Sequence, residues 1–363
     1  MGNNKEVIII TGCSGRIGKA TVQKFKDPRY QIVGLDIVEP NFSAPNFDFV
    51  KTDLTSDLNV IDAMEFVRKK HGGLIASVIH LAAYYNFTGG AWDLYEKITI
   101  QGTERLLYAV QKFQTEQFLF SSTMLVHAPC APPAKITEDT PLATNWEYPK
   151  SKVLTEELIL KEHDKIPVVM LRIAGCYDDD CHSIPISNQM QRIYEHQLES
   201  KLFPGDLSHG ASFLHLDDLA DAIFLCVQKR AELPPESIFL LGEEETMSYD
   251  ALQKEISKLL TGKEMTTLRI PKSFAKFAAW MQNRLPFMKK TFIKPWMIDL
   301  ADENYTLDIS RIKKALSWTP KRSLRKTLPI MAKALTTDPK CWYKENDLEM
   351  QAVNGSSCCG SCK

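Results

Sequence analysis

The sequence predicts an α/β fold in which a doubly wound parallel sheet carries a smaller C-terminal lobe. The first observation is that short apolar runs alternate with helical patterns through residues 1–177. The second is that this alternation stops near residue 178, and a stretch rich in Pro, Met and aromatic residues follows at 271–297. Alternation of strands and helices is typical of a parallel sheet with helices on both faces. A chain of 363 residues is long enough for such a domain and a second lobe.

The apolar runs are interpreted as buried strands. Val7–Ile10 is continuous and β-branched, as expected for a strand that is covered on both faces. The further predicted strands are Gln31–Leu35, Phe47–Val50, Ala76–His80, Gln117–Ser121 and Val168–Leu171. The helical patterns between them cover Ile17–Phe25, Asn59–Lys70, Gly102–Phe113 and Pro149–His163.

The change of pattern near residue 178 divides the chain. We expect residues 1–177 and 211–243 to form the sheet domain, because the apolar segment Phe213–Gln228 indicates a return to it. Residues 178–210 and 244–336 are expected to form the lobe. Residues 337–363 are polar and include Cys358, Cys359 and Cys362, which predicts a flexible tail.

The overall composition is that of an ordinary globular protein, with 44% hydrophobic and 25% charged residues. The net charge of -1 gives no drive toward nucleic acid or an anionic membrane. Nine mostly scattered cysteines predict reduced thiols and a cytoplasmic location. Neither cysteines nor histidines show the spacing of a metal site, so no metal is expected. No apolar run reaches the ~18 residues that a membrane span needs.

A glycine-rich turn, Thr11-Gly12-Cys13-Ser14-Gly15-Arg16-Ile17-Gly18, directly follows the first strand. Gly12 permits the tight turn, Gly15 lets the backbone approach a pyrophosphate, and Gly18 allows the next helix to pack closely. The N–H groups at the start of that helix favour phosphate. The position between a strand and a helix favours a dinucleotide site over a turn without a ligand. The predicted cofactor-binding residues here are Gly12, Ser14, Gly15, Arg16, Ile17 and Gly18.

Asp36 ends the second strand, close to the ~20-residue spacing expected for a carboxylate that binds the ribose hydroxyls of adenosine. A carboxylate there repels a 2′-phosphate, so we expect NAD rather than NADP. The alternative is a solvated aspartate at a strand end. Arg16 could approach a 2′-phosphate, which keeps NADP open. Asp53 and Leu54, after the third strand, are expected to flank the adenine.

Tyr148 and Lys152 lie at positions i and i+4 and therefore share one face of a predicted helix. A phenol titrates near ~10, and a neighbouring ammonium favours its ionised form. The pair is therefore expected to move a proton, with Lys152 also binding the nicotinamide ribose. Ser121-Ser122-Thr123 ends a predicted strand, where a hydroxyl can orient the substrate oxygen. In isolation, each of these features could be an ordinary surface or strand-end residue.

Together these motifs resemble the extended short-chain dehydrogenases/reductases, the NAD-dependent epimerase/dehydratase superfamily. The turn matches TGxxGxxG and Tyr148-Pro149-Lys150-Ser151-Lys152 matches YxxxK. The resemblance implies that Thr123 is the catalytic hydroxyl, and that the backbone of Leu81, Ala82 and Ala83 lines the cofactor. Later segments are also similar to family motifs, in the family's order: residues 171–177, 213–220 and 315–320.

Departures from the family pattern bear on the substrate. Met124-Leu125 replace the acidic pair of the dehydratases, and Ala211-Ser212 stand where epimerases of sugar nucleotides have Arg-Asp. Gly175 and Thr99 replace two usual asparagines. A diphosphate site should offer charge-assisted donors, and these positions offer none. The layout resembles the 3β-hydroxysteroid dehydrogenase and dihydroflavonol reductase branches more closely.

Three functions follow as hypotheses. The first is hydride transfer between a nicotinamide cofactor and an alcohol or ketone of a hydrophobic small molecule. The alternatives are a sugar-nucleotide epimerase or dehydratase and a non-catalytic nucleotide sensor. The aromatic, Met- and Lys-containing stretch 274–297 is interpreted as lobe core, a substrate wall or a peripheral membrane contact. By resemblance, a homodimer is expected through the helices that begin near Gly102 and that carry Tyr148.

Overall fold

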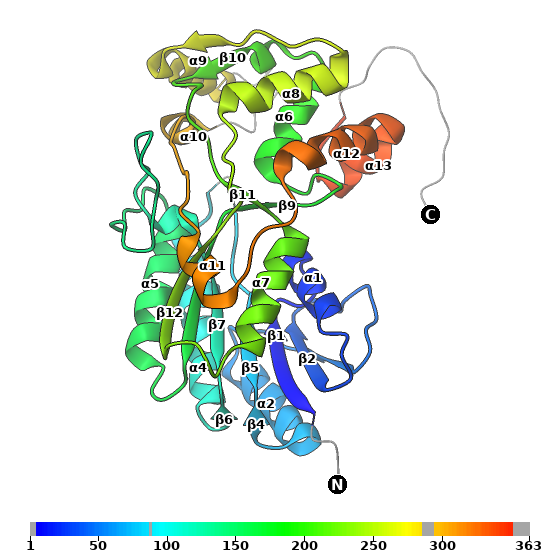
Figure 1. Cartoon of the computed structure of the whole chain (residues 1–363), viewed down its shortest axis with the longest axis vertical. Helices are drawn as coiled ribbons and strands as arrows, with labels where there is room; N and C mark the ends of the chain where they lie inside the picture. The colour runs from blue at the N-terminus through cyan, green and yellow to red at the C-terminus, as the bar shows by residue number, and fades with distance from the viewer. Residues whose placement is uncertain (1–4, 87–88, 285–293, 351–363) are drawn as a thin grey trace.

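The computed structural model describes residues 5–86, 89–284 and 294–350 (Figure 1). Its centre is a seven-stranded sheet in which each neighbouring pair is parallel. The strands in spatial order are β12 (Glu236–Leu241), β8 (Val168–Ile173), β7 (Phe118–Thr123), β5 (Ser77–His80), β1 (Glu6–Thr11), β2 (Tyr30–Asp36) and β3 (Phe47–Lys51). The order reverses between β1 and β5, which confirms the predicted doubly wound sheet. Six of these strands were predicted, whereas β12 was not.

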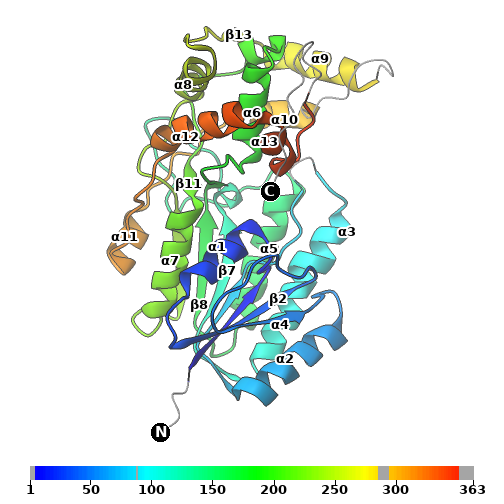
Figure 2. The same cartoon turned by 90° about the vertical axis from the view of Figure 1, so that its right-hand side faces the viewer.

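Helices cover both faces of the sheet (Figure 2). On one face lie α1 (Arg16–Lys24) and α7 (Leu216–Gln228), and on the other α2 (Asp57–His71), α4 (Gln101–Val110) and α5 (Glu147–Glu162). The alternation along β1 explains this arrangement. Ile8 and Ile10 belong to the core under α1 and α7, and Val7 and Ile9 belong to the core under the other three helices.

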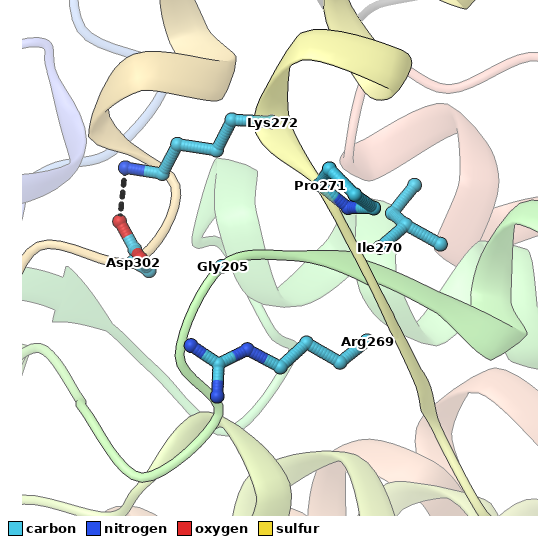
Figure 3. A pocket seen from close by; sticks show the side chains of 6 residues that line it. All are labelled: Gly205, Arg269, Ile270, Pro271, Lys272 and Asp302. Atoms are coloured by element: carbon cyan, nitrogen blue, oxygen red, sulfur yellow. Dashed lines mark ion pairs between the residues drawn. The ribbon is translucent and has the colours of Figure 1, made fainter.

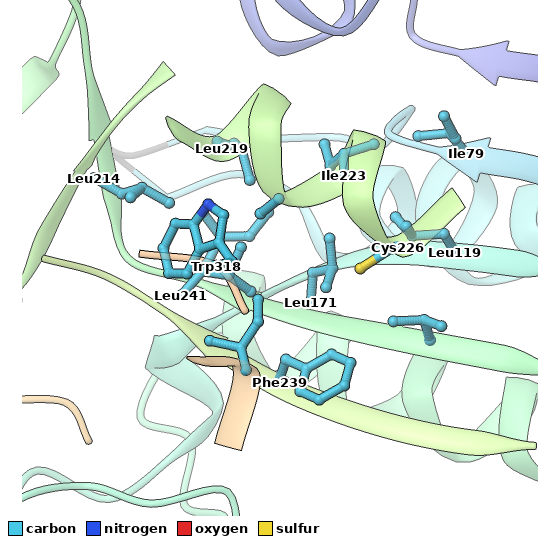
Figure 4. Close-up of a cluster of buried hydrophobic side chains, with 14 of the residues drawn as sticks. Ile79, Leu119, Leu171, Leu214, Leu219, Ile223, Cys226, Phe239, Leu241 and Trp318 are labelled. Atoms are coloured by element: carbon cyan, nitrogen blue, oxygen red, sulfur yellow. The ribbon is translucent and has the colours of Figure 1, made fainter. Parts of the chain in front are cut away.

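The core under α7 also includes residues 310–318, which the sequence analysis assigned to the lobe. Leu219, Ile223 and Cys226 of α7 pack with strand residues and with Trp318 (Figure 4). Helix α11 (Ser310–Leu316) packs against β12 and α7, with Ile312 and Leu316 buried. Residues 310–318 therefore lie with the sheet domain, because their apolar side chains complete its core.

The lobe contains the helices α6 (Ile184–Tyr194), α8 (Tyr249–Thr261), α9 (Lys272–Arg284), α10 (Pro295–Leu300) and α12 (Leu324–Thr337). Of these, α6, α8 and α12 share a separate core, while α9 packs against α10. The expectation of a flexible tail from residue 337 is wrong for its first part. Residues Pro339–Glu345 form helix α13, because Trp342 and Tyr343 are buried in the lobe core.

Short elements connect these layers. Three two-stranded parallel sheets pair β4 (Leu74–Ile75) with β6 (Gln114–Thr115), β9 (Gly175–Tyr177) with β11 (Phe213–His215), and β10 (Leu202–Pro204) with β13 (Leu268–Ile270). The short helical pieces are α3 (Trp92–Leu94), η1 (Tyr95–Ile100), η2 (Met124–Val126) and η3 (Leu198–Lys201).

Candidate active site

A cavity of 760 Å³ lies between the sheet domain and the lobe. Its walls come from the glycine-rich turn, the ends of β5, β7 and β8, helix α5, the start of α6, helix α10 and residues 346–347. A second hollow of 460 Å³ lies within the lobe, where Lys272 pairs with Asp302 (Figure 3). The two share no lining residue, and only the larger one contains the predicted catalytic residues.

The glycine-rich turn has the geometry that its motif predicts. Gly12 has φ +69°, and a Cβ there would lie 2.9 Å from the backbone nitrogen of Ala82. A Cβ on Gly18 would collide with the backbone of Gly12 and Cys13. Only glycine therefore lets the turn and the start of α1 come this close to β1 and β5. The cavity is lined by Gly12, Gly15, Arg16, Ile17 and Gly18.

The end of β5 is fixed to the turn through Thr11. Its hydroxyl accepts hydrogen bonds from the backbone N–H groups of Leu81 and Ala82, at 3.2 and 3.1 Å. It also lies 2.7 Å from His80 Nδ1, while His80 Nε2 lies 2.7 Å from Thr103. Complete burial lowers the pKa of His80 to about 3, so this histidine is a neutral structural link. Leu81 and Ala83 line the cavity, and Ala82 lies between them.

Asp36 and Ser14 meet beside the turn. Asp36 Oδ2 accepts the backbone N–H of Ser14 at 3.0 Å, and Oδ1 accepts that of Val38 at 3.2 Å. The Ser14 hydroxyl donates to the Val38 carbonyl at 2.5 Å. These bonds hold the carboxylate at the end of β2, although neither Asp36 nor Ser14 lines the cavity itself.

Asp53 and Leu54 also lie outside the cavity lining. Asp53 is exposed, and its carboxylate accepts the backbone N–H and the hydroxyl of Thr55, each at 2.8 Å. Leu54 is buried in the core, where its Cβ would lie 3.2 Å from a Cβ on Gly102. In this structure both residues have local structural roles at the start of α2.

Tyr148 and Lys152 both line the cavity from the first turns of α5. Lys152 is 2% exposed, and its Nζ donates to the Ser121 carbonyl at 2.6 Å. The same Nζ lies 5.9 Å from the centre of the Tyr148 ring. The i, i+4 spacing thus brings the two side chains together as predicted.

Burial is the largest influence on the pKa values of Tyr148 and Lys152. It lowers the pKa of Lys152 to about 7, against the opposing charge of Glu156. The pKa of the Tyr148 phenol is raised, chiefly by burial and then by Tyr85, whereas Thr123 lowers it. The expected net lowering by Lys152 is therefore not found in the chain alone, because the cost of burying a phenolate is larger.

Thr123 and Ser122 line the same part of the cavity, at the end of β7. The Thr123 hydroxyl accepts the backbone N–H of Leu125 at 3.3 Å, and Thr123 lies close enough to Tyr148 to lower the pKa of its phenol. Among the described residues, the buried Ser122 hydroxyl has no hydrogen-bond partner. The sequence argument chose Thr123, and the structure adds Ser122 as a second hydroxyl that a ligand can reach.

A buried ion pair joins α5, the helix that carries Tyr148 and Lys152, to strand β8. Glu156, one turn after Lys152, binds Arg172 of β8 through two hydrogen bonds of 3.1 and 2.6 Å. Arg172 also donates to the Glu138 carbonyl at 3.1 Å and lies 3.0 Å from His127 Nε2. This network ties α5 to β8 and fixes where Lys152 points.

The lobe side of the cavity is aromatic, and the sequence motifs did not identify it. The Tyr85 and Tyr148 rings meet edge to face at 4.8 Å, and Trp146 lies 5.5 Å from Tyr148 and 5.3 Å from Trp296. Glu303 is the carboxylate on this side, and burial raises its pKa. Loops supply Tyr85, Trp146 and Glu303, so no spacing rule could have found them, whereas Trp296 lies in the stretch 274–297 that the sequence named as a possible substrate wall.

Only some residues of the predicted substrate wall at 274–297 line the cavity. Trp296 and Met297 line it. Phe274, Phe277 and Trp280 are 59%, 57% and 47% exposed on α9, so they form neither core nor cavity wall. The predicted wall residues Leu285, Phe287, Met288 and Phe292 lie outside the described residues.

The described part of the chain offers no group of three or more His, Cys, Asp or Glu that could hold a metal ion. Its six described cysteines are free thiols. Of the helices in residues 5–86, 89–284 and 294–350, none is long and apolar enough to cross a membrane.

Comparison with known proteins places these features in a family. Residues 8–242 match the sequence model of the NAD dependent epimerase/dehydratase family. The matched region contains every residue of the predicted cofactor and catalytic sites.

Individual relatives include different enzyme types. A sterol-4-alpha-carboxylate 3-dehydrogenase (decarboxylating) of Candida albicans is 23% identical over 89% of this chain and 96% of its own length. A UDP-glucose 4-epimerase of Bacillus subtilis is 25% identical over 71% of this chain and 83% of its own. The structure of a short-chain dehydrogenase/reductase superfamily protein from Agrobacterium tumefaciens with bound NAD has a TM-score of 0.69 and 20% identity, covering 94% of this chain and 100% of that one.

Proposed function

The chain belongs to the NAD-dependent epimerase/dehydratase family, and from this premise we propose that it transfers hydride between NAD and an alcohol or ketone of a hydrophobic small molecule. The observation that carries the proposal is that Thr123, Tyr148 and Lys152 share one cavity with the glycine-rich turn. The cofactor supplies the hydride acceptor or donor, and the protein must therefore supply the proton transfer.

The three side chains are proposed to divide that task. In oxidation, Tyr148 accepts the proton of the substrate hydroxyl, and in reduction it donates it. Thr123 hydrogen-bonds the reacting oxygen and positions it at the phenol. Lys152 holds the nicotinamide ribose, and its charge, with that of the oxidised nicotinamide ring, favours the phenolate over the neutral phenol that burial otherwise stabilises.

The cofactor is proposed to lie along the turn and the ends of β2 and β5. Backbone N–H groups of Arg16 and Ile17, at the start of α1, would face the diphosphate, as expected at a helix N-terminus. Asp36 would bind the adenosine ribose. Ser14, Asp53, Leu54 and the segment Leu81-Ala82-Ala83 remain proposed members of this site.

The walls of the cavity favour an apolar substrate. Tyr85, Trp146, Trp296, Met297 and Leu300 line its lobe side. Large aromatic surfaces bind apolar rings by removing them from water. The sterol dehydrogenase relative acts on a molecule of this kind, judging by its name.

The sugar-nucleotide alternative lacks comparable support on the substrate side. Gly175, Ala211 and Ser212 line the cavity and carry no charged donor for a diphosphate. Relatives that act on UDP-sugars keep this function as the second candidate.

A spectrophotometric screen separates the two candidates. Purified protein is offered NAD or NADH with panels of hydroxysteroids and their ketones, flavonoids, and nucleotide sugars. We expect net NADH formation or consumption with an apolar ring substrate. Conversion of a nucleotide sugar without net change in NADH would instead establish an epimerase or dehydratase.

We further propose the cytoplasm as location, since the six described cysteines are free thiols. Residues 1–177 and 211–243 are proposed to act as the cofactor domain. We also propose a homodimer through α4 and α5, and a peripheral membrane contact through α9. The outward apolar residues of these helices, such as Tyr108 (54% exposed) and Phe277 (57% exposed), support both contacts.

A further inference from the structure

His182 carries a polar atom that the fold leaves without a partner. Its side chain is only 10% exposed, and its Nδ1 lies 2.5 Å from Asp178 Oδ2. Its Nε2 is buried and has no hydrogen-bond partner within the described part of the chain. His182 nevertheless lines the active-site cavity. A buried ring nitrogen without a partner is costly, which indicates that a ligand atom completes it.

Asp178 holds the imidazole in place. Its Oδ1 accepts the backbone N–H groups of Asp180 and His182 at 3.1 and 3.0 Å. Burial works against ionisation of Asp178, but the hydrogen bonds from His182 outweigh it and lower the pKa of the carboxyl group, with a contribution from Arg16. A carboxylate at Nδ1 leaves Nε2 to face the ligand, and an imidazolium donates from both nitrogens.

The surroundings of His182 favour an anionic ligand. Helix α6 begins two residues later, and its first-turn residues Ile184, Pro185 and Ser187 line the cavity. The N-terminus of a helix carries partial positive charge and free N–H groups. Arg16 lines the same cavity, although Asp347 does so as well and contributes a negative charge. Arg16 Nη2 donates to the Glu345 carbonyl, and Asn346 of the same segment donates to the Asp180 carbonyl, two residues before His182. The segment 345–346 thus connects Arg16 to the loop that carries His182.

We propose that His182, held by Asp178, donates from Nε2 to the diphosphate of the bound dinucleotide. The inference rests on the proposed function for the identity of the cofactor. A sugar-nucleotide substrate also carries a diphosphate. The cofactor is favoured because Arg16 begins the helix that follows the glycine-rich turn, and Gly12 and Gly15 line this cavity.

The test is calorimetric binding of three probes to the full chain: ADP-ribose, NADH and UDP-glucose. The variant His182→Phe keeps a ring but has neither nitrogen. A hydrogen bond to a charged group is worth roughly 1.5–3 kcal/mol, so we expect the dissociation constants of ADP-ribose and NADH to rise together by about 10-fold or more. Asp178→Asn should weaken both by a smaller factor, and it remains informative if His182→Phe does not fold. The control is His163→Gln, whose ring lies at the end of α5 with Nδ1 2.9 Å from the Ile166 carbonyl, and it should change nothing.

Other outcomes overturn the proposal. Weaker binding of NADH but not ADP-ribose would place the contact on the nicotinamide half, and weaker binding of UDP-glucose alone would place it on a substrate. If a folded His182→Phe variant binds all three probes as tightly as the wild type does, His182 makes no contact with the diphosphate. Binding of ADP-ribose requires no turnover, so an inactive wild-type protein that still shows the expected losses would refute only the proposed function.

Discussion

We expect the choice between NAD and NADP to depend on Asp36. Its carboxylate is held by the backbone N–H groups of Ser14 and Val38, at the end of β2 next to the turn. A fixed negative charge there favours ribose hydroxyls and repels a 2′-phosphate. Both effects depend on the charge rather than on the shape of the side chain.

Replacing that charge should narrow the cofactor preference. Loss of a charge-assisted hydrogen bond costs roughly 1.5–3 kcal/mol, so in Asp36→Ala the dissociation constant of NAD should rise about tenfold or more while that of NADP stays level or falls. Asp36→Asn removes the charge but keeps an acceptor for one of the two backbone bonds, so comparison with Asp36→Ala separates the loss of charge from damage to the loop. Fluorescence titration with NADH and NADPH measures the change. A wild-type protein that prefers NADPH would contradict the assignment.

Residue chemistry was predictable where a motif fixes spacing. Tyr148 and Lys152 follow from four-residue periodicity, and Gly12 and Gly18 follow from the close approach of α1 to β1. The sign of the Tyr148 pKa shift was not predictable, because burial depends on side chains such as Tyr85 that arrive from distant loops. The orphan nitrogen of His182 likewise appears only in three dimensions.

At the scale of elements, the C-terminal segment after α12 is the main surprise. Asn346 and Asp347 line the cavity, and the Glu345 carbonyl accepts Arg16 Nη2 at 2.7 Å. Asn346 Nδ2 donates to the Asp180 carbonyl at 3.3 Å. The polar composition suggested a loose tail, but two aromatic residues at 342–343 are enough to anchor a short helix in the lobe core.

Truncation after Glu345 should therefore loosen the cofactor site. It retains α13 but removes Asn346 and Asp347 from the cavity, and a hydrogen bond contributes about 1 kcal/mol, so NADH dissociation should accelerate about fivefold. Stopped-flow fluorescence measures this rate. Truncation after Met350 keeps all of these contacts and serves as control. Equal NADH release rates for both truncations would show that the segment has no part in the site.

At the scale of the whole molecule, the sheet was predictable and the lobe was not. Buried parallel strands are nearly continuous apolar runs, and for this reason six of the seven strands of the sheet could be predicted from the sequence. The lobe core brings together residues of α6, α8, α12 and α13, and the sheet-domain core includes residues 310–318. Both arrangements depend on long-range contacts that no local period records. On the aromatic side of the cavity, Trp296 and Met297 lie in the stretch that the sequence named as a possible substrate wall, whereas Tyr85 and Trp146 were not predicted.

Association of two chains should use α4 and α5. The buried residues of α5 face its own sheet, which leaves Leu154 and Leu158 partly exposed, and Tyr108 is exposed on the neighbouring helix α4. We expect a dimer mass by light scattering at micromolar concentration. Leu158→Glu, with Tyr108→Glu, should convert it to monomer, because like charges without a partner are costly to bury. A monomeric wild-type protein contradicts this interface.

Membrane contact should use the exposed apolar face of α9. Phe274, Phe277 and Met281 follow helical spacing, and Lys276 is paired with Asp299. Burying one such side chain contributes roughly 1.5–3 kcal/mol, so Phe277→Ser should weaken sedimentation with phosphatidylserine-containing vesicles about tenfold. Leu58→Ser alters another exposed residue, on α2, and should have no effect. Failure of the wild-type protein to sediment with any vesicle would refute the contact.

The central claim, that Tyr148 moves the proton during hydride transfer, is tested most directly by single-turnover and steady-state kinetics of Tyr148→Phe. The substrate is the alcohol or ketone that the NADH screen identifies. A general acid–base group contributes ~10²–10⁴-fold, so kcat should fall by about that factor while the NADH dissociation constant stays within about twofold. Tyr85→Phe, whose ring lies 4.8 Å from that of Tyr148, should keep most of the activity. Wild-type turnover by Tyr148→Phe would contradict the account.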